Sequence, residues 1–262
     1  MSHYKDQEIA DSIMRPVEII DAPAPSHDWL ISPKLNGVFA RWEPGRGLFS
    51  KRGILFRRRL IPHIYKALED TSPNLALDGE IWAPSFMLGE ITGALSHERD
   101  DTTPLAHMLK YHIFDAPLTF VPYYRRHSRI NALASNNILV VPYKEHTGEE
   151  HFPLNDTFDG HIYRRRLGIY SAGPCNNVQK LKSWRDMELP VISVTLGYKH
   201  EKSFMQALVC SVGATSVSVG TGFSMNERAL FNTHPPKSIK VRYINLSADG
   251  VPLNPSYIGL DL

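Results

Sequence analysis

The sequence predicts an α+β chain with antiparallel sheets and flanking helices, which ends in a small β-barrel. Two observations indicate this fold class. Residues 28–134 mix short β-prone runs with segments of helical spacing, and mixed elements with hairpin turns are typical of α+β folds. From Leu189 onward the chain carries short alternating runs, about five strands in roughly 70 residues, which fits a small barrel.

The first part of the chain reads as strands and helices separated by turns. Asn36-Gly37 is a strong turn signal, and it predicts that the strands on its two sides form a meander. Helices are predicted over Leu60–Asp70 and Tyr124–Ala134, where apolar residues recur at helical spacing. The predicted strands are Trp29–Ser32, Val38–Trp42, Gly47–Ser50, Leu75–Leu77, Glu80–Trp82 and Tyr111–Phe114.

The last part of the chain changes pattern, which predicts two domains, 1–187 and 188–262. One short helix is predicted near Asn226–Asn232, among strands that alternate apolar and polar residues. Those strands are Val191–Val194, Met205–Cys210, Ser216–Val219 and Ile239–Tyr243.

Composition narrows the class of protein. A chain of 262 residues fits one or two domains. No apolar run reaches 18 residues and the N-terminus is polar, so neither a membrane span nor a secretory signal is expected. Two cysteines are too few for a disulfide framework, and a cytoplasmic location follows.

The net charge of +2 does not by itself indicate nucleic acid. Three arginine runs, 57–59, 125–126 and 164–166, stand out in this nearly neutral chain. Each run alone also fits a solvated face. Together, beside the motif-bearing strands described below, they predict a phosphate-contacting surface.

Lys34 is the candidate nucleophile, because Ile31–Gly37 places it between a hydrophobic strand and a tight turn. Lys-x-x-Gly alone indicates little in a chain with 29 lysines and arginines. The order of the segments that follow is more specific. They are Ser50–Gly53, Leu77–Glu80, His112–Asp115, Phe158–Arg164 and Gln179–Lys182.

This ordered series resembles the motifs of the covalent nucleotidyltransferases, and most of all those of the minimal ATP-dependent DNA ligases of viruses and bacteria. The resemblance extends from about residue 16 to the C-terminus. It implies an adenylation domain over 1–187 and an OB-fold over 188–262, where Val219–Ser224 resembles a characteristic strand-turn. It also implies an enzyme that uses ATP and Mg²⁺ or Mn²⁺ to seal 5′-phosphate/3′-hydroxyl nicks. Its partner would be nicked duplex DNA, its state a monomer, and no membrane would be involved.

The resemblance also implies roles for individual residues. Lys34 would form the lysyl-AMP, which requires its deprotonated amine. Lys180 and Lys182, two residues apart on a strand, would point to one face and bind the α-phosphate. The remaining roles are metal coordination by Glu80 and Asp159, adenine packing by Phe114 and Ile162, ribose contact by Glu80, and nucleotide binding by Ser32 and Lys51.

Several positions depart from the motifs of the resembled ligases. Phe39 stands where the first motif usually has arginine, and Arg41, two residues on, is a candidate substitute. Lys51 replaces an arginine, and Leu253 and Asp261 stand where arginines are expected near the C-terminus. Two alternatives therefore stay open. The chain could be an RNA ligase with the same chemistry, or a catalytically impaired nucleic-acid-binding protein that keeps the ligase fold.

Overall fold

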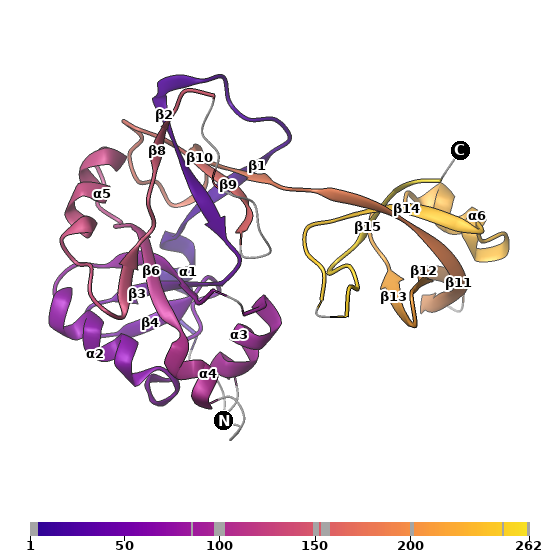
Figure 1. Cartoon of the computed structure of the whole chain (residues 1–262), viewed down its shortest axis with the longest axis horizontal. Helices are drawn as coiled ribbons and strands as arrows, with labels where there is room; N and C mark the ends of the chain where they lie inside the picture. Colours follow the sequence, from indigo (N-terminus) through magenta and orange to yellow (C-terminus); the bar gives the residue numbers. More distant parts are fainter. Residues whose placement is uncertain are drawn as a thin grey trace. The chain divides into compact units, whose positions relative to one another are not determined.

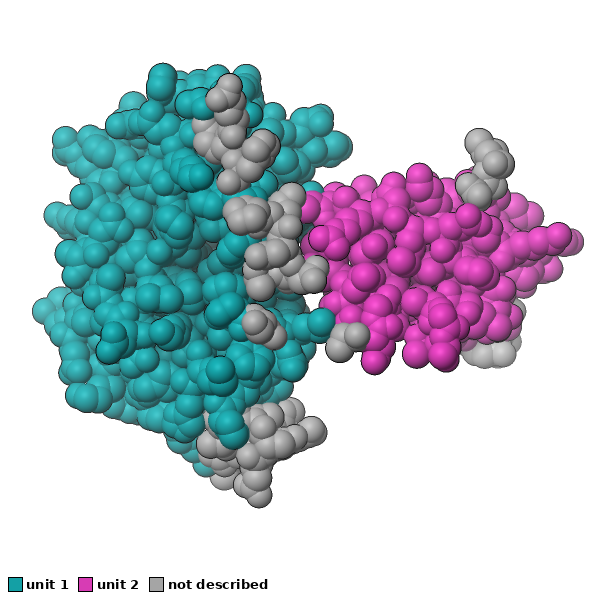
Figure 2. Space-filling model, viewed as in Figure 1, with its two compact units in different colours: residues 1–182 teal, residues 183–262 magenta. Residues whose placement is uncertain are grey.

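The computed structural model describes residues 5–84, 86–96, 103–148, 152, 158–199, 202–247 and 249–260. The chain divides into two compact units, Met1–Lys182 and Ser183–Leu262, which Figure 2 colours separately. Each unit has its own hydrophobic core. The division falls a few residues before the position expected from the sequence, because the long strand that opens unit 2 starts at Arg185.

Unit 1 is built on two five-stranded sheets (Figure 1). In the first sheet the strand order is β1-β10-β9-β2-β8, with β1 at Met14–Ile19, β10 at Gly173–Lys182, β9 at Phe158–Arg165, β2 at Ser26–Leu35 and β8 at Lys144–His146. In the second the order is β4-β3-β5-β6-β7, with β4 at Gly47–Ser50, β3 at Val38–Glu43, β5 at Leu77–Trp82, β6 at Lys110–Asp115 and β7 at Ile138–Val140. Neighbours pair antiparallel except in β1–β10 and β6–β7. The antiparallel-rich α+β prediction is confirmed.

The helices of unit 1 cover the second sheet. They are α1 (Gln7–Ser12), η1 (Arg58–Leu60), α2 (Pro62–Thr71), α3 (Leu88–Ser96), α4 (Thr103–Met108) and α5 (Tyr123–Asn131). Ile64 and Leu68 of α2 and Ile130 of α5 are fully buried in one cluster with the strand residues Leu77 and Ile113. Each such side chain contributes about 1.5–3 kcal/mol by leaving water. No helix among the described residues is long and apolar enough to cross a membrane.

The predicted meander across Asn36-Gly37 is wrong. β2 ends at Leu35 and β3 begins at Val38, but the two strands lie in different sheets, so this turn carries the chain from one sheet to the other. Gly37 does not have the positive φ that a two-residue hairpin needs. Glycine is required at position 37 because the turn packs directly on β5: a Cβ there would lie 2.6 Å from the carbonyl oxygen of Ile81.

Unit 2 is a five-stranded antiparallel sheet with one helix, α6 (Met225–Thr233). The strand order is β13-β12-β11-β14-β15, with β13 at Thr215–Val219, β12 at Lys202–Val212, β11 at Arg185–Lys199, β14 at Ser238–Tyr243 and β15 at Ser256–Gly259. A capping box of Ser224 and Glu227 begins α6, and Phe231 on that helix is buried in the core of the unit.

The two edges of this sheet meet at one isolated bridge. Thr221, just after β13, pairs with Ser256 at the start of β15, and the Tyr257 N–H donates to the Thr221 carbonyl at 2.9 Å. The approach requires Gly222, whose φ is +93° and where a Cβ would lie 2.2 Å from the Tyr257 carbonyl oxygen. No closing ladder of strands is found among the described residues of unit 2, so the barrel predicted there stays a prediction.

Candidate functional site

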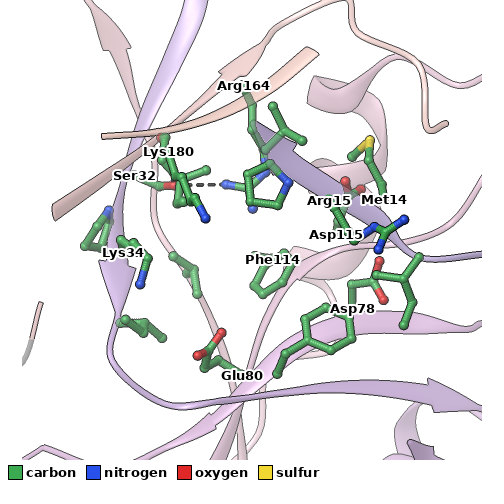
Figure 3. Close-up of a pocket in the computed structure, with 18 of the residues that line it drawn as sticks. Met14, Arg15, Ser32, Lys34, Asp78, Glu80, Phe114, Asp115, Arg164 and Lys180 are labelled. Atoms are coloured by element: carbon green, nitrogen blue, oxygen red, sulfur yellow. Dashed lines mark hydrogen bonds between the residues drawn. The ribbon is translucent and has the colours of Figure 1, made fainter. Parts of the chain in front are cut away.

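Unit 1 contains a cavity of about 300 Å³ that collects most of the candidate residues. Figure 3 shows Lys34, Lys180 and Glu80 converging on the space beside Phe114. The predicted residues that line the cavity are Ser32, Lys34, Lys51, Glu80, Phe114, Ile162, Lys180 and Lys182. They come from strands of both sheets and from the turn after β4, and they span most of unit 1 in sequence, so the fold brings together the residues that the motif order predicted. Asp159 is not part of the lining but touches Lys34.

Strand register explains why the cationic side chains share one face. β9 lies between β2 and β10, and Gly160 of β9 is opposite Lys34 on one side and Lys182 on the other. In the next row Ile162 is opposite Ser32 and Lys180. Residues opposite each other on neighbouring strands point to the same face, and so do residues two apart on one strand. The two rows therefore present three lysines to the cavity.

A β-bulge directs Asp159 toward Lys34. Lys34 is opposite Gly160 and Leu35 is opposite Phe158, so the register of the two strands shifts by one residue at Asp159. Bulges of this kind re-aim a side chain. Asp159 Oδ2 accepts from Lys34 Nζ at 2.7 Å, with both side chains largely buried. Gly160 has φ +141° and a Cβ there would lie 2.1 Å from the Leu181 carbonyl oxygen, so only glycine fits beside the bulge.

Glu80 lies within β5, so Asp78-Gly79-Glu80 is a strand segment and not a hairpin turn. Its Oε1 accepts from the Gly37 N–H at 3.1 Å, which ties it to the turn after Lys34. Burial raises the pKa of Glu80 to about 7; the Lys34 ammonium and the Gly37 N–H oppose this shift, and Asp159 adds to it. Glu80, Asp159 and Lys34 therefore act on one another electrostatically at one side of the cavity.

Phe114 and Arg164 form the wall opposite Lys34. The Arg164 guanidinium carbon lies 5.0 Å from the centroid of the Phe114 ring. The centroids of the Phe39 and Phe114 rings are 6.2 Å apart, and the two ring planes are tilted relative to each other. Arg164 donates to Ser32 Oγ at 3.1 Å, and Ser32 donates to the Ile162 carbonyl (Figure 3). Ser32 and Arg164 are both buried. Ser32 thus orients an arginine at the cavity wall.

The cavity has an excess of positive charge. Arg15, Lys34, Lys51, Arg164, Lys180 and Lys182 line it, against Asp78, Glu80 and Asp115. Two of these carboxylates form ion pairs with arginines that are not part of the lining, Asp78 with Arg41 and Asp115 with Arg126. Partial burial and repulsion from Lys180, Arg15 and Lys34 lower the pKa of Lys51. A cationic cavity of this size fits a phosphorylated ligand.

Arg41 does not replace the arginine that the first motif lacks. It is 2% exposed, and its guanidinium binds Asp78 at 2.5 and 3.1 Å and Tyr170 at 2.6 Å, behind the cavity wall. Burying an arginine requires a paired carboxylate, and Asp78 is that carboxylate. Phe39 itself lines the cavity. At the C-terminus Leu253 is 37% exposed, and Asp261 lies outside the described residues.

The arginines of the three runs lie in different environments. Arg126 is 1% exposed and bound to Asp115, whereas Arg125 is exposed, since adjacent residues on helix α5 point in different directions. Arg164 is buried at the cavity wall, while Arg58 and Arg59 are exposed. Single arginines of these runs therefore serve the core, the cavity and the surface, and the phosphate-contacting surface expected of the three runs stays a prediction.

Two arginines that line the cavity, Arg15 and Arg164, have no predicted role in the site. Arg15 lines it from β1, and no sequence feature distinguishes Arg15 from other surface arginines. Arg164 belongs to a basic run and ends the motif segment Phe158–Arg164, but neither feature predicts a role for its side chain in the site. Its spacing of two from Ile162 on a predicted strand was the available signal, because alternate residues share a face.

Glu80 and Asp159 fit a single hard divalent cation. Mg²⁺ takes oxygen ligands and keeps several waters, so one or two carboxylates beside a phosphate site suffice. The two carboxylates interact with each other and with Lys34 at the cavity. Among the described residues no three or more side chains form a cluster that could bind a metal ion by themselves. Mg²⁺ does not need such a cluster, because it can be held mainly by water and phosphate oxygens.

The raised pKa of Glu80 predicts a pH-dependent stability in metal-free buffer. The folded-state value of about 7 lies above the ordinary 4.5, so the folded protein holds a proton that the unfolded chain has released between these pH values. Stability is therefore lost as pH rises from 4.5 to 7. Glu80→Gln should match wild type at pH 4.5 and be more stable at pH 8 by about 1–3 kcal/mol. Urea unfolding in the presence of EDTA measures the free energy of unfolding of both proteins. A difference between Glu80→Gln and wild type that is the same at pH 4.5 and pH 8 would contradict the prediction.

Comparison with known proteins gives one curated relative and many solved structures. No protein-family model matches the chain. A DNA ligase of Haemophilus influenzae is 27% identical over 244 residues, which covers 89% of this chain and 87% of the relative. One similar structure comes from a study of Lig E DNA ligases and of DNA binding with a minimal scaffold. The match covers 95% of this chain and 100% of that chain, at 18% identity and a TM-score of 0.73. The bacteriophage T7 ATP-dependent DNA ligase, solved with ATP, matches 97% of this chain at 11% identity and a TM-score of 0.52.

The resemblance that the motif series indicates is therefore confirmed. The chain is similar in sequence to a DNA ligase, and similar in fold to a Lig E DNA ligase and to the ATP-dependent DNA ligase of bacteriophage T7. The mixed α+β fold that the sequence predicts is the fold of these proteins.

Proposed function

We propose that this chain is an ATP-dependent DNA ligase that seals nicks with a 5′-phosphate and a 3′-hydroxyl. The single observation that carries the proposal is the cavity that Lys34 lines together with Lys180 and Lys182, with Asp159 and Glu80 beside Lys34. The similarity to a curated DNA ligase over most of both chains supports the substrate class.

In the first step the Lys34 amine attacks the α-phosphorus of ATP. A phosphorus–nitrogen bond forms, the bond to the β-phosphate oxygen breaks, and pyrophosphate leaves. An amine attacks only without its proton, and the Asp159 carboxylate, 2.7 Å from Nζ, is within reach of that proton. Lys180 and Lys182 stabilise the negative charge on the phosphate oxygens during the attack. When bound at Glu80 and Asp159, Mg²⁺ would neutralise further phosphate charge.

Two more displacements complete the reaction. The 5′-phosphate of the nick attacks the lysyl-AMP, which frees Lys34 and forms a DNA-adenylate. The 3′-hydroxyl then attacks the activated 5′-phosphorus, a phosphodiester forms and AMP leaves. Both steps depend on positioning and charge stabilisation in the same cavity. Phe114 and Ile162 supply the apolar surface against which the adenine ring packs.

The domain roles follow from the same proposal. Unit 1 would be the adenylation domain and unit 2 an OB-fold. The Thr221–Ser256 bridge supports the second assignment, because it joins the two edge strands of the five-stranded sheet, as closure into a barrel requires. Phe223, directly after Gly222, stacks on Tyr257 at 4.4 Å and packs this junction into the core of the unit.

The proposal is tested by intact mass and sealing in one series. The purified protein is incubated with ATP and Mg²⁺ and should gain the mass of one AMP. It should then seal a nicked DNA duplex and pass through a resolvable DNA-adenylate. The same nick built in RNA separates the RNA-ligase alternative, which requires comparable or faster sealing of RNA. A protein that binds nicked DNA but never gains AMP would be the catalytically impaired alternative.

A further inference from the structure

Glu18 binds both phosphate-site lysines at once. Its Oε2 is 3.3 Å from Lys180 Nζ and 2.9 Å from Lys182 Nζ. The lysine side chains are 25% and 23% exposed, and the glutamate is 42% exposed. Burial raises the pKa of Glu18, but Lys182 and Lys180 outweigh burial and lower it below its ordinary value, so Glu18 is charged at neutral pH.

A shift of register brings Glu18 to this position. β1 pairs parallel to β10, with Pro16 opposite Cys175 but Val17 opposite Gln179. The shift moves Lys180 opposite Glu18 and places the carboxylate at the end of the row that contains Ser32, Ile162 and Lys180. The backbone ladder therefore holds Glu18 beside Lys180 and Lys182, the two lysines that line the cavity.

One oxygen atom shared by two ammonium groups is the arrangement that a non-bridging phosphate oxygen would take between the same lysines. A carboxylate oxygen and a phosphate oxygen are both charge-assisted acceptors at similar distances. Both cannot take the same position, and a phosphate beside the Glu18 carboxylate would be repelled by it. The lysines must exchange one anion for the other.

We propose that Glu18 is an internal counter-ion that occupies Lys180 and Lys182 in the nucleotide-free protein and is displaced by the incoming phosphate group, so that it sets the affinity of the cavity for nucleotides. The inference rests on the proposed function only in the identity of the nucleotide. Glu18 keeps the two ammonium groups from repelling each other while the cavity is empty, and its release offsets part of the binding free energy of the phosphate.

Calorimetric binding of AMP tests this directly. AMP has no pyrophosphate to lose, so its Kd is measured without reaction. Glu18→Gln keeps the shape of the side chain but removes its charge, and it should bind AMP about three- to tenfold more tightly than wild type at low salt, the range expected for partly exposed ion pairs. Adenosine, which lacks the phosphate, should bind wild type and Glu18→Gln equally.

Glu145→Gln is the matched control. Glu145 is also 42% exposed and also binds two side chains, His27 and Arg166, but neither of these partners lines the cavity, whereas Lys180 and Lys182 do. Its replacement should leave the Kd for AMP within about twofold of wild type. Glu18→Ala should behave as Glu18→Gln does, which guards against an effect of the new amide group.

Three outcomes would overturn the proposal. AMP could bind Glu18→Gln with equal or lower affinity, which would make Glu18 a positioning residue for the lysines. Adenosine could gain as much affinity as AMP, which would separate the effect from phosphate. Wild type and variants could all fail to bind AMP, in which case the lysines are not a phosphate site. Tighter AMP binding by Glu18→Gln in a protein that never gains AMP from ATP would instead contradict the proposed function and leave the counter-ion in place.

Discussion

Replacing Lys34 by alanine is expected to abolish the AMP adduct and to reduce sealing of nicked DNA by at least about 10⁴-fold, the scale of removing a covalent nucleophile. The side chain of Lys34 lies in the row opposite Gly160 and Lys182, where the proposed lysyl-AMP would form. Intact mass after incubation with ATP and Mg²⁺ measures the adduct, and gel assays of nicked duplex measure sealing.

Two controls sharpen this experiment. Lys66→Ala removes an exposed lysine of α2 that pairs with Asp70 and does not line the cavity. This variant should form the AMP adduct and seal nicked DNA as wild type does. A nicked duplex that already carries AMP on its 5′-phosphate bypasses Lys34. Lys34→Ala should seal that substrate much better than the ordinary nick, because the last displacement needs no lysine nucleophile.

The outcome that contradicts the assignment is an adduct that survives in Lys34→Ala. Peptide mass would then locate the modified residue. Lys51 is the first alternative, since it lines the same cavity and its pKa is lowered by partial burial and by the neighbouring cations. Such a result would keep the covalent chemistry and move the nucleophile from β2 to the residue after β4.

The candidate site could be predicted well from the order of the motifs. Lys34, Glu80, Phe114 and Lys180 are far apart in sequence, and no local pattern says that they meet. Each one alone fits an ordinary surface or core residue. The resemblance supplied the long-range information, because a motif series carries with it the pairing of strands that brings the motifs together.

Other parts of the site could not be predicted, for physical reasons. Glu18 meets the lysines only because the register of β1 and β10 shifts between Pro16 and Val17, and a shift of register has no sequence signature. Arg15 lies on the same parallel strand, whose partner is distant in the chain. Pairing over such separations depends on the whole sheet, whereas propensity and periodicity describe only the local chain.

The fold shows the same division between local and long-range information. Helices α2 and α5 lie within a few residues of their predicted bounds, because helical spacing of apolar residues is a local property. The sequence predicts the turn at Asn36-Gly37 correctly, but the strands on its two sides lie in different sheets and do not form the predicted meander. A turn signal states that the chain changes direction, and it does not state which strand becomes the neighbour.

Buried arginines were the least predictable feature and give the second large expected effect. Arg126 and Asp115 are each 1% exposed and form a two-point pair, with Nε to Oδ1 at 2.7 Å and the second nitrogen to Oδ2 at 3.0 Å. Arg126 also donates to the carbonyl oxygens of Val121 and Gly168. Arg126→Met should destabilise the protein by about 3–5 kcal/mol, because it leaves Asp115 buried without its partner. The midpoint of thermal unfolding of unit 1 should fall by about 10 °C.

The matched comparison is Arg58→Met. Arg58 pairs with Glu69 at the surface, where the two side chains are 58% and 41% exposed, and its loss should cost less than about 1 kcal/mol. Burial already raises the pKa of Asp115 against the opposing pull of Arg126, so without Arg126 the carboxyl takes up a proton more readily. The loss of stability in Arg126→Met should therefore shrink as pH falls. Equal effects of the two variants at neutral pH would show that the buried pair adds nothing, and that the cavity wall formed by Asp115 does not depend on Arg126 behind it.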